Sequence, residues 1–515
     1  MHRGAALADR ILVASRGSRF FEHEQRRHER TGARIAELVA RRDAALAAVP
    51  HGSVAWSDAE AAIDRAAAAL EAARDLSRTI LHCDMDMFFA AVEQRADPTL
   101  AGKRFAVGSS VVLTASYEAR EFGVRSGMGT HVALALCPDL IVLDGRYDVY
   151  RAYSSRIMNV LRTYDENIYP RSLDEAFLDV TDYCMHKELP VDELVAELRR
   201  RVADATGLTV SVGIAPNMML AKIVSDYRKP NGQYRLPPEA KAIRTFMAAL
   251  PVRKVPGIGG VAERELGALG VTTCGDIWER RVELHAALGD ISSLLRIALG
   301  LGKTSVRPPA REERRSCGRE STFAPTTNVA ALHDHLRTAC RKLAADLEGL
   351  GFAGRTLTLV GKRQNFQRFS RARTLPAAIA GEGALYEAAV RLLHECGVRP
   401  ALRLIGVRLT GLVDLQYTGP LSQWLARHHA PEEPVKPGTD GDTHKNLAND
   451  ACGANSTPQR PTGRAEMAGP ECPVCTAAIP ITIDAALDAL AESTEVNAHI
   501  DACLNSKPRA HSRPQ

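Results

Sequence analysis

The sequence predicts an α+β protein with several domains. From residue 79 to about residue 234, short apolar stretches suited to buried strands alternate with helix-forming stretches, and strands and helices mix again over 311–412. The connections between these stretches differ in length, which favours α+β over a regular βα repeat. With 515 residues, the chain is long enough for three or four domains.

The composition is that of a globular protein without a membrane span. Apolar residues make up 45% of the chain and charged residues 25%, which excludes wholesale disorder. No apolar run reaches the ~18–20 residues that a span needs, and no secretory signal is expected. A mitochondrial presequence stays an alternative, because the N-terminal residues include Arg3, Arg10 and Arg16. The 11 mostly isolated cysteines read as intracellular thiols, and a net charge of +5 is too small to identify a partner.

The elements expected in the first half follow from local composition. Stretches 20–42 and 59–74 are rich in helix formers, and by pattern alone they are a pair of solvated helices. Strands are expected over 79–83, 105–107, 111–115, 140–143, 177–180 and 209–214. Helices are expected over 87–94, 133–137, 150–164, 191–206 and 218–227, with Asp86 as N-cap of the first.

The second half is expected to be more varied. Residues 241–305 read as helical, with a Gly-rich turn at Pro256–Gly259. Strands are expected over 357–360 and 404–409. Residues 430–470 have almost nothing to bury and read as a disordered linker, and a small Cys/His module follows over 471–504.

Three acids are the strongest candidates for chemistry. Asp84 ends a predicted buried strand, and the adjacent Asp174 and Glu175 come just before another. An unpaired carboxylate in such a place costs several kcal/mol, and neighbouring carboxylates repel unless a cation holds them. Hard oxygen ligands at strand ends suit a pair of Mg²⁺ ions in phosphoryl transfer. For any one of these acids alone, a surface turn is the more common explanation.

Several residues could contact a nucleotide. The helix after Asp86 offers free N–H groups to an anion. Tyr117 and Arg120 are three residues apart, so on a helix they share a face, and Lys229 stands in a predicted turn. Each alone is more often a surface residue. Phe88 and Phe89 follow the acidic strand; by base rate they are core, although a bulky ring beside a sugar could exclude a 2′-hydroxyl.

Two segments could bind a phosphate backbone. The Pro256–Gly259 turn suits a helix-hairpin-helix, whose N–H groups approach a DNA phosphate, although an αα-corner is at least as frequent. Residues 355–375 contain no acid and have interleaved phenylalanines, so they are either an electrostatic footprint for nucleic acid or a solvated face. Their basic residues are Arg355, Lys362, Arg363, Arg368, Arg371 and Arg373.

The most specific short signal lies near the C-terminus. Cys472 and Cys475 form a CxxC pair, and His499 and Cys503 form an HxxxC pair. Three thiolates and one imidazole make a tetrahedral structural zinc set. A module of this size needs a structural metal to fold, because it is too small to form a stable hydrophobic core alone.

Five ordered motifs carry a family resemblance. They are ILHCDMDMFFAAVE (80–93), YEAREFGVR (117–125), SLDEAFLDV (172–180), AKIVSDYRKPNGQ (221–233) and KVPGIG (254–259). Together they resemble a Y-family translesion DNA polymerase of the polymerase IV and kappa branch, over residues 79–412. ILVASRGSRFF (11–21) and the following helices resemble the N-terminal clasp of the kappa group, and CPVC…NAHIDACL resembles its ubiquitin-binding zinc finger.

The resemblance implies a right-hand polymerase fold with added modules. It implies a clasp (1–78), palm and fingers (79–249), thumb (250–310), little finger (311–412), linker (413–470), zinc finger (471–504) and tail (505–515). Asp84, Asp174 and Glu175, with the Met85 carbonyl, would bind two Mg²⁺ ions, for which Mn²⁺ could substitute. The other implied roles are nucleotide binding by Phe88, the steric gate Phe89, Thr114, Tyr117, Arg120 and Lys229, and DNA binding by Gly257, Gly259, Arg355, Lys362, Arg363 and Arg371. Asp501 matches the acid that contacts ubiquitin in such fingers.

Departures from the family pattern weaken some expectations. The 23 residues between Cys475 and His499 lengthen the finger loop, which leaves zinc binding intact and makes ubiquitin binding less secure. Gly361 and Phe369 interrupt the basic and apolar alternation of the little finger, and Arg319 and Ser321 also depart, so lesion preference does not carry over. Thr418–Leu425 resembles a sliding-clamp box but begins with Thr where the box has Gln.

The resulting hypothesis is a low-fidelity, template-directed DNA polymerase acting in translesion synthesis. Its expected partners are primer–template DNA, dNTPs, ubiquitin or a ubiquitinated sliding clamp, and the clamp itself, with no membrane. The nucleus is the expected compartment and the mitochondrion the alternative. Two rival functions are a non-catalytic DNA- and ubiquitin-binding scaffold at stalled forks and a deoxycytidyl transferase of the same fold.

Overall fold

The computed structural model describes residues 19–308 and 314–415. Within these residues, no helix combines the length and apolarity needed to cross a bilayer. Several sequence predictions fall outside the described ranges: the clamp-box candidate Thr418–Leu425, the zinc ligands Cys472, Cys475, His499 and Cys503, and the ubiquitin contact Asp501.

A five-stranded sheet carries the predicted catalytic acids. Its spatial order is β5 (Tyr169–Pro170), β6 (Glu175–Asp179), β1 (Ile80–Met85), β7 (Val210–Ala215) and β8 (Gln233–Arg235). The central strand β1 is antiparallel to both β6 and β7. Every residue of β7 is buried, and so are five of the six residues of β1. Both strands are rich in apolar residues, as is typical of strands covered on both faces, and β1 also carries the polar residues His82 and Asp84.

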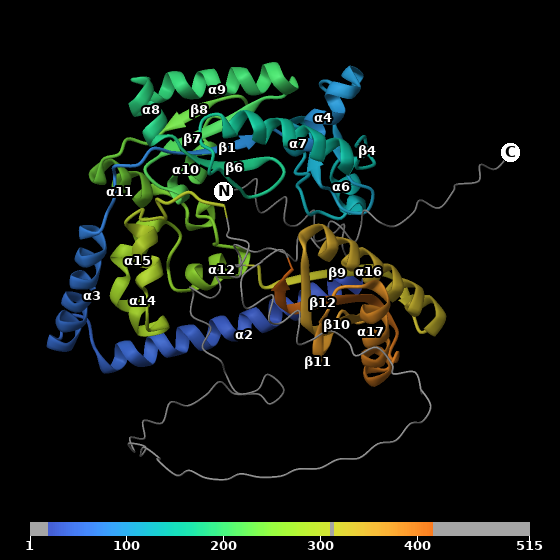
Figure 1. Ribbon diagram of the computed structural model, residues 1–515. Helices are drawn as coiled ribbons and strands as arrows, with labels where there is room; N and C mark the ends of the chain where they lie inside the picture. The colour runs from blue at the N-terminus through green and yellow to red at the C-terminus, as the bar shows by residue number, and fades with distance from the viewer. Residues whose placement is uncertain (1–18, 309–313, 416–515) are drawn as a thin grey trace, which may run out of the picture. The chain divides into compact units, whose positions relative to one another are not determined.

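Helices cover the two faces of this sheet. Helices α7 (Tyr147–Arg162) and α9 (Val191–Thr206) share a core with Leu81, Cys83 and Met85 of β1. Helix α10 (Met218–Ser225) packs against β1 and β7 from the opposite side (Figure 1). Since side chains alternate along a strand, His82 and Asp84 point to the α10 face.

A smaller sheet lies beside the helix that follows β1. Its order is β3 (Thr114–Ala115), β2 (Phe105–Val107) and β4 (Ile141–Leu143), and its helices are α4 (Phe88–Ala96), α5 (Tyr117–Glu121) and α6 (Thr130–Leu136). The strand predicted over 111–115 is shorter than expected, because Val111 forms only an isolated bridge with Gly129.

The predicted N-cap at Asp86 is wrong. Helix α4 has Met87 at its N-cap position, with φ 39° and ψ 49° and no side-chain cap. The Asp86 side chain turns inward and is only 3% exposed. The carboxylate accepts hydrogen bonds from distant segments of the chain instead, so tertiary contacts replace the local cap.

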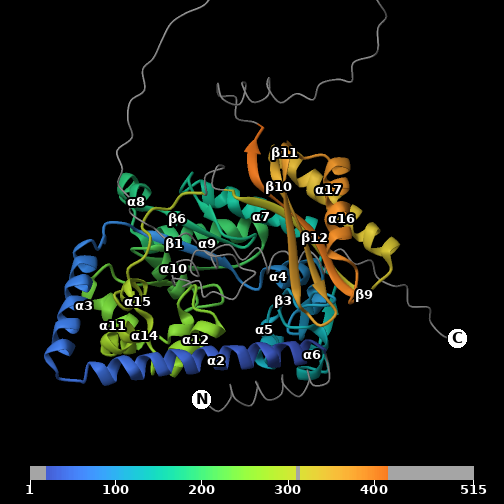
Figure 2. The ribbon, with the colours of Figure 1, turned by 90° about the horizontal axis from the view of Figure 1, so that it is seen from below.

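The helical region consists of α11 (Ala240–Ala249), α12 (Gly260–Ala268), α13 (Cys274–Glu279), α14 (Arg281–Leu288) and α15 (Ser292–Ala298). The N-terminal helices α2 (Arg19–Ala48) and α3 (Val54–Ala72) pack on it, with α2 running past α12 and α14 (Figure 2). Ile63 and Ala67 of α3 join its hydrophobic cluster. The Arg281 guanidinium lies 2.8 Å from Glu60 and 2.6 Å from Asp64. The N-terminal pair is therefore docked, and the interpretation as merely solvated helices is wrong.

A four-stranded antiparallel sheet forms the last described region. Its order is β11 (Arg368–Ile379), β10 (Phe352–Arg363), β12 (Leu402–Asp414) and β9 (Ser316–Thr326). Helices α16 (Val329–Leu350) and α17 (Glu382–Cys396) pack on one face through Leu357, Leu359 and other apolar residues (Figure 1). The opposite face is polar, with Thr358 and Arg408 as cross-strand partners.

Candidate active site

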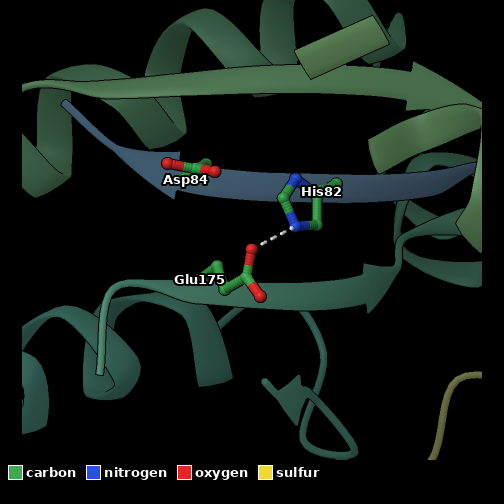
Figure 3. A group of neighbouring side chains, drawn as sticks. All are labelled: His82, Asp84 and Glu175. Carbon is green, nitrogen blue, oxygen red and sulfur yellow. Dashed lines mark ion pairs between the residues drawn. The ribbon is translucent and has the colours of Figure 1, made fainter. Parts of the chain in front are cut away.

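Two of the predicted carboxylates lie side by side on neighbouring strands. Asp84 of β1 and Glu175 of β6 are cross-strand partners. His82, two residues earlier on β1, points to the same face, and its Nε2 lies 3.3 Å from Glu175 Oε2 (Figure 3). One ligand atom from each of these three side chains lies within 4.8 Å of the other two. The antiparallel pairing thus brings together acids that are 91 positions apart in the sequence, counted from residue 84 to residue 175.

Asp174 lies at the same edge of the sheet. Its carbonyl accepts a hydrogen bond from the Met85 N–H at 3.0 Å, which places it beside the end of β1. The Ser172 hydroxyl donates to the Asp174 carboxylate at 2.5 Å. Burial, reinforced by the negative charge of Asp84, raises the pKa of Asp174 to about 6. A carboxyl group so disfavoured as an anion, beside two more acids, indicates a place for cations.

Lys222, which the sequence analysis did not select, lies against these acids. It extends from α10, where its ammonium contacts Glu175 and lies 3.4 Å from His82 Nε2. Burial opposes ionisation of Glu175, but the hydrogen bond with His82 and the charge of Lys222 outweigh it and hold the pKa of Glu175 well below its usual range. Burial lowers the pKa of His82, whose Nδ1 lies 3.0 Å from Ser225 Oγ.

Lys229, which the sequence did predict, reaches the other acid. Its Nζ lies 2.6 Å from Asp84 Oδ1 and 3.6 Å from Asp226 Oδ1. Burial works against its charge, but the Asp84 carboxylate outweighs this effect and raises the pKa of Lys229. A fixed ammonium beside the Asp84 carboxylate suits an incoming phosphate group.

The donor set fits a hard divalent cation. Carboxylate oxygens are the ligands that Mg²⁺ and Mn²⁺ prefer, and Asp84, Asp174 and Glu175 supply them at one sheet edge. His82 is fully buried and already faces Glu175 and Ser225, so it supports a ligand instead of replacing one. The cluster therefore has the oxygen donors that an acidic metal site needs.

Tyr117 and Arg120, two more of the predicted nucleotide contacts, lie together on α5. Tyr117 opens α5, and the Arg120 guanidinium carbon lies 4.9 Å from its ring centroid, so the two share a face as expected. The Tyr117 hydroxyl donates to Asp86 at 3.3 Å. Burial, with the negative charge of Asp86, raises the pKa of Tyr117. Thr114 lies in β3, three residues before Tyr117.

The two phenylalanines differ in their surroundings. Phe88 is 2% exposed and belongs to the hydrophobic cluster between β1 and helices α7 and α9. Phe89 is partly exposed and stacks on Tyr150, with ring centroids 4.2 Å apart and an interplanar angle of 13°. The Tyr150 hydroxyl donates to Glu93 at 2.5 Å, and Arg146 pairs with the same carboxylate. The Phe89 ring is therefore held in place by the hydrogen-bonded Tyr150, whereas Phe88 is part of the hydrophobic core.

A cavity of about 660 Å³ joins Asp84 to the Gly-rich turn. Asp84 and Lys222 line it on one side, and Leu250, Pro251 and residues 253–259 line it on the other. Gly257 has φ 97°, a conformation that favours glycine, and Gly259 is the N-cap of α12. A side chain at Gly259 would meet nothing within 4 Å, so the backbone there is open to a ligand.

The basic stretch over 355–375 divides between two faces of the four-stranded sheet. Arg371 pairs with Leu359, a residue of the helix-covered face, and lies 3.8 Å from Glu395 of α17. Arg363 donates to the Arg399 carbonyl at 2.6 Å. Lys362 lies on the polar face, because it has the same parity along β10 as Thr358, the cross-strand partner of Arg408. Arg355 donates to the Pro376 carbonyl at 3.1 Å.

His82, Lys222 and Ser225 were not predicted as site residues, although their spacing in the sequence could have indicated them. His82 and Asp84 are two apart on a strand, and Lys222 and Ser225 are three apart on a helix, so each pair shares a face. What the sequence did not contain was the packing of α10 across β1, which makes the four residues neighbours.

Known families match the same regions. The impB/mucB/samB family matches residues 83–226, the family's helix-hairpin-helix motif matches 240–271, and its C-terminal domain matches 314–421. DNA polymerase kappa of Arabidopsis thaliana is 38% identical over 406 residues, which cover 78% of this chain and 60% of the relative. DNA polymerase IV of Alkalilimnicola ehrlichii is 40% identical over 347 residues, which cover 65% of this chain and 96% of the relative.

A solved structure agrees with these matches. A Y-family DNA polymerase chimera superposes with a TM-score of 0.57 at 30% identity, covering 65% of this chain and 99% of the solved one. The chain spans only 55% to 60% of the length of the kappa relatives from human and Arabidopsis thaliana, but nearly all of the bacterial one. The α+β fold, the acidic sheet edge and these matches together place the chain in the impB/mucB/samB family, in the polymerase IV and kappa group of the Y-family DNA polymerases.

Proposed function

We propose that this chain is a low-fidelity, template-directed DNA polymerase that acts in translesion synthesis. The observation that carries the proposal is the sheet edge where Asp84, Asp174 and Glu175 meet, with Lys229 directed at Asp84. Phosphoryl transfer depends mainly on positioning and electrostatic stabilisation, and this edge offers both. The family's polymerase relatives support the same reaction.

Asp84, Asp174 and Glu175, with the Met85 carbonyl, would hold two Mg²⁺ ions, which Mn²⁺ could replace. Such ions activate the primer 3′-hydroxyl and stabilise charge on the transferred phosphate. Burial and the negative charge of Asp84 raise the pKa of Asp174, and bound cations would stabilise its anionic form. Lys222 contacts Glu175 and fixes its orientation.

The incoming dNTP would lie between the sheet edge and α5. Lys229, Arg120, Tyr117 and Thr114 would contact its triphosphate. Phe89, held by the Tyr150 stack, would exclude a ribose 2′-hydroxyl. Phe88, as a buried core residue, would act by supporting Phe89, since their ring centroids are 5.4 Å apart.

Primer–template DNA would follow the cavity and the polar sheet face. The turn containing Gly257 and Gly259 borders the cavity that ends at Asp84, so the primer backbone would reach the carboxylates from there. On the four-stranded sheet, Lys362 and Arg408 would contact the phosphate backbone. Arg363 donates to the Arg399 carbonyl and Arg371 lies beside Glu395 of α17, so both would contribute less.

Primer extension with purified protein, Mg²⁺ and all four dNTPs tests the proposal. Wild-type protein should extend a primer over short patches with frequent errors, and Asp174→Asn should abolish extension while leaving DNA binding intact. Asp182→Asn, an acid of the nearby α8 (Thr181–Lys187) outside the site, is the matched control. Wild-type protein that binds DNA but adds nothing would support the scaffold alternative. Addition of dCMP alone, whatever the template base, would support a deoxycytidyl transferase.

The C-terminal predictions extend this proposal to partners. Cys472, Cys475, His499 and Cys503 would bind structural Zn²⁺, Asp501 would contact ubiquitin, and Thr418–Leu425 would bind a sliding clamp. Such partners imply a nuclear enzyme, with the mitochondrion as the alternative. One zinc per chain in wild-type protein and none in Cys475→Ala would support the finger. Ubiquitin binding lost in Asp501→Ala, with zinc retained, would support the partner.

A further inference from the structure

Asp86 is a buried carboxylate that the proposed chemistry does not use. It follows β1 directly, two residues after Asp84, and is only 3% exposed. Its two oxygens accept four hydrogen bonds. The donors are the Ser211 hydroxyl at 2.7 Å and the Tyr117 hydroxyl at 3.3 Å on Oδ1, and the Thr209 hydroxyl at 2.7 Å and the Asn231 N–H at 2.7 Å on Oδ2.

These four donors come from three separate parts of the chain. Ser211 lies in β7 and Thr209 just before it, so they tie Asp86 to the palm sheet. Tyr117 belongs to α5, and Asn231 belongs to the turn that carries Lys229. One carboxylate thus connects the sheet to both segments expected to hold the triphosphate.

The Lys229 turn depends strongly on this connection. Asn231 has φ 50°, and a side chain at Gly232 would lie 1.9 Å from the Arg228 carbonyl oxygen, so the backbone there is tightly constrained. Arg199 of α9 holds the turn from the other side, through the Asn231 carbonyl and, at 2.8 Å, the Asn231 side chain. Asp86 and Arg199 therefore fix the backbone two residues beyond Lys229.

We propose that Asp86 is a positioning residue that holds Tyr117 and the Lys229 turn in one geometry relative to the acidic sheet edge, and so sets the affinity for the triphosphate of the nucleotide. This inference rests on the proposed function. It concerns a residue that touches neither metal nor nucleotide and acts through two residues that would.

The hydrogen-bonding capacity of the side chain predicts which substitutions are tolerated. In Asp86→Asn, the amide oxygen can still accept from Asn231 and Thr209, and the amide nitrogen can donate to Ser211 and Tyr117, whose hydroxyls also accept. In Asp86→Ala, the Asn231 N–H and the three hydroxyls lose their shared acceptor, and for the fully buried Ser211 hydroxyl such a loss is costly. The Lys229 turn should then move, while the asparagine variant should keep it.

Steady-state kinetics separate positioning from general stability. At a temperature where all variants are folded, Asp86→Ala should raise the KM for dNTP about tenfold, with a smaller change in kcat, as expected when a charge-assisted contact is misplaced. Asp86→Asn should stay within about threefold of wild type. Asp276→Ala is the matched control, because Asp276 also accepts several hydrogen bonds but lies at the start of α13. It should lower stability and leave the KM unchanged.

Hydrogen exchange tests the connection without any catalysis. In DNA-free protein, the Asn231 amide should exchange at least about tenfold faster in Asp86→Ala than in wild type, in Asp86→Asn or in Asp276→Ala. An Asn231 amide that stays protected in Asp86→Ala would overturn the proposal, and so would an unchanged KM. If wild type does not extend primers, the proposed function fails, while the exchange result still decides whether Asp86 holds the turn.

Discussion

Gly361 and Phe369 are cross-strand partners on β10 and β11, and the Phe369 ring fills the space that a side chain at Gly361 would need. A Cβ atom at Gly361 would lie 2.2 Å from the Phe369 ring. In the sequence, both residues interrupt the family's alternating pattern. They are one compensated pair, in which the missing side chain makes room for the ring.

This pairing predicts a non-additive stability effect. Gly361→Ala should destabilise the protein by about 1–3 kcal/mol, because the ring must leave its place against the sheet. Phe369→Ala alone should cost a similar amount through lost packing. The double variant should be more stable than the sum of both losses implies, since the clash then disappears. Urea denaturation of the four proteins measures this coupling, and strict additivity would contradict it.

A second prediction concerns acid stability. Burial disfavours the Asp276 anion, but hydrogen bonds from Thr272 and Thr273 outweigh it and lower the pKa of Asp276 to about 2. Because the folded pKa lies below the unfolded one, this group stabilises the fold above about pH 4, and the contribution is lost as the pH falls toward 2. Asp276→Asn should therefore be about 1 kcal/mol less stable than wild type at pH 6, with the gap narrowing at pH 3. Denaturation midpoints over this range are the measurement, and a constant gap would count against it.

The third prediction concerns sugar selection. Phe89→Ala should admit ribonucleotides and raise the ratio of rNTP to dNTP incorporation by about ten- to hundredfold, as expected when one steric contact is removed. Single-nucleotide incorporation with each nucleotide gives this ratio. Phe323→Ala is the control, because this ring stacks on His335 in the four-stranded-sheet region. An unchanged ratio in Phe89→Ala would show that another group discriminates.

The fourth prediction separates the two faces of the four-stranded sheet. Arg408→Ala should weaken DNA binding and reduce the slope of log affinity against log salt by about one, because one phosphate contact disappears. Arg371→Ala should change the slope less, since this side chain lies toward Glu395 on the helix-covered side. Binding titrations between low and physiological salt test both variants. Equal slopes for them would argue against the division by face.

Local sequence patterns predicted most strands and helices of the five-stranded-sheet region. They predicted fewer elements of the four-stranded-sheet region. The buried strands at 79–83 and 209–214 and the helix at 191–206 were legible because apolar runs and helical periodicity are local signals. Strands β9 and β11 were missed, because their polar and basic residues lie on a half-open sheet and do not form apolar runs.

In the candidate site too, local sequence features were predicted correctly and contacts between distant segments were not. The acids were found from their places at strand ends, but Asp86 was taken for a helix cap because sequence proximity favours the local partner. Two of its four donors, Thr209 and Asn231, are more than a hundred residues away and meet it only after the sheet forms. Likewise, the acid-free run over 355–375 gains carboxylate neighbours such as Glu395 from other elements.

The docked N-terminal helices have a consequence for how this chain could have diverged. Ile63 and Ala67 belong to the same hydrophobic cluster as Ile277 and Val282, and Arg281 reaches back to two acids of α3. A version beginning at residue 79 would expose this apolar surface and leave a largely buried guanidinium without its partners. The extension and the helical region it covers must therefore change together, so that gaining or losing one requires a matching redesign of the other.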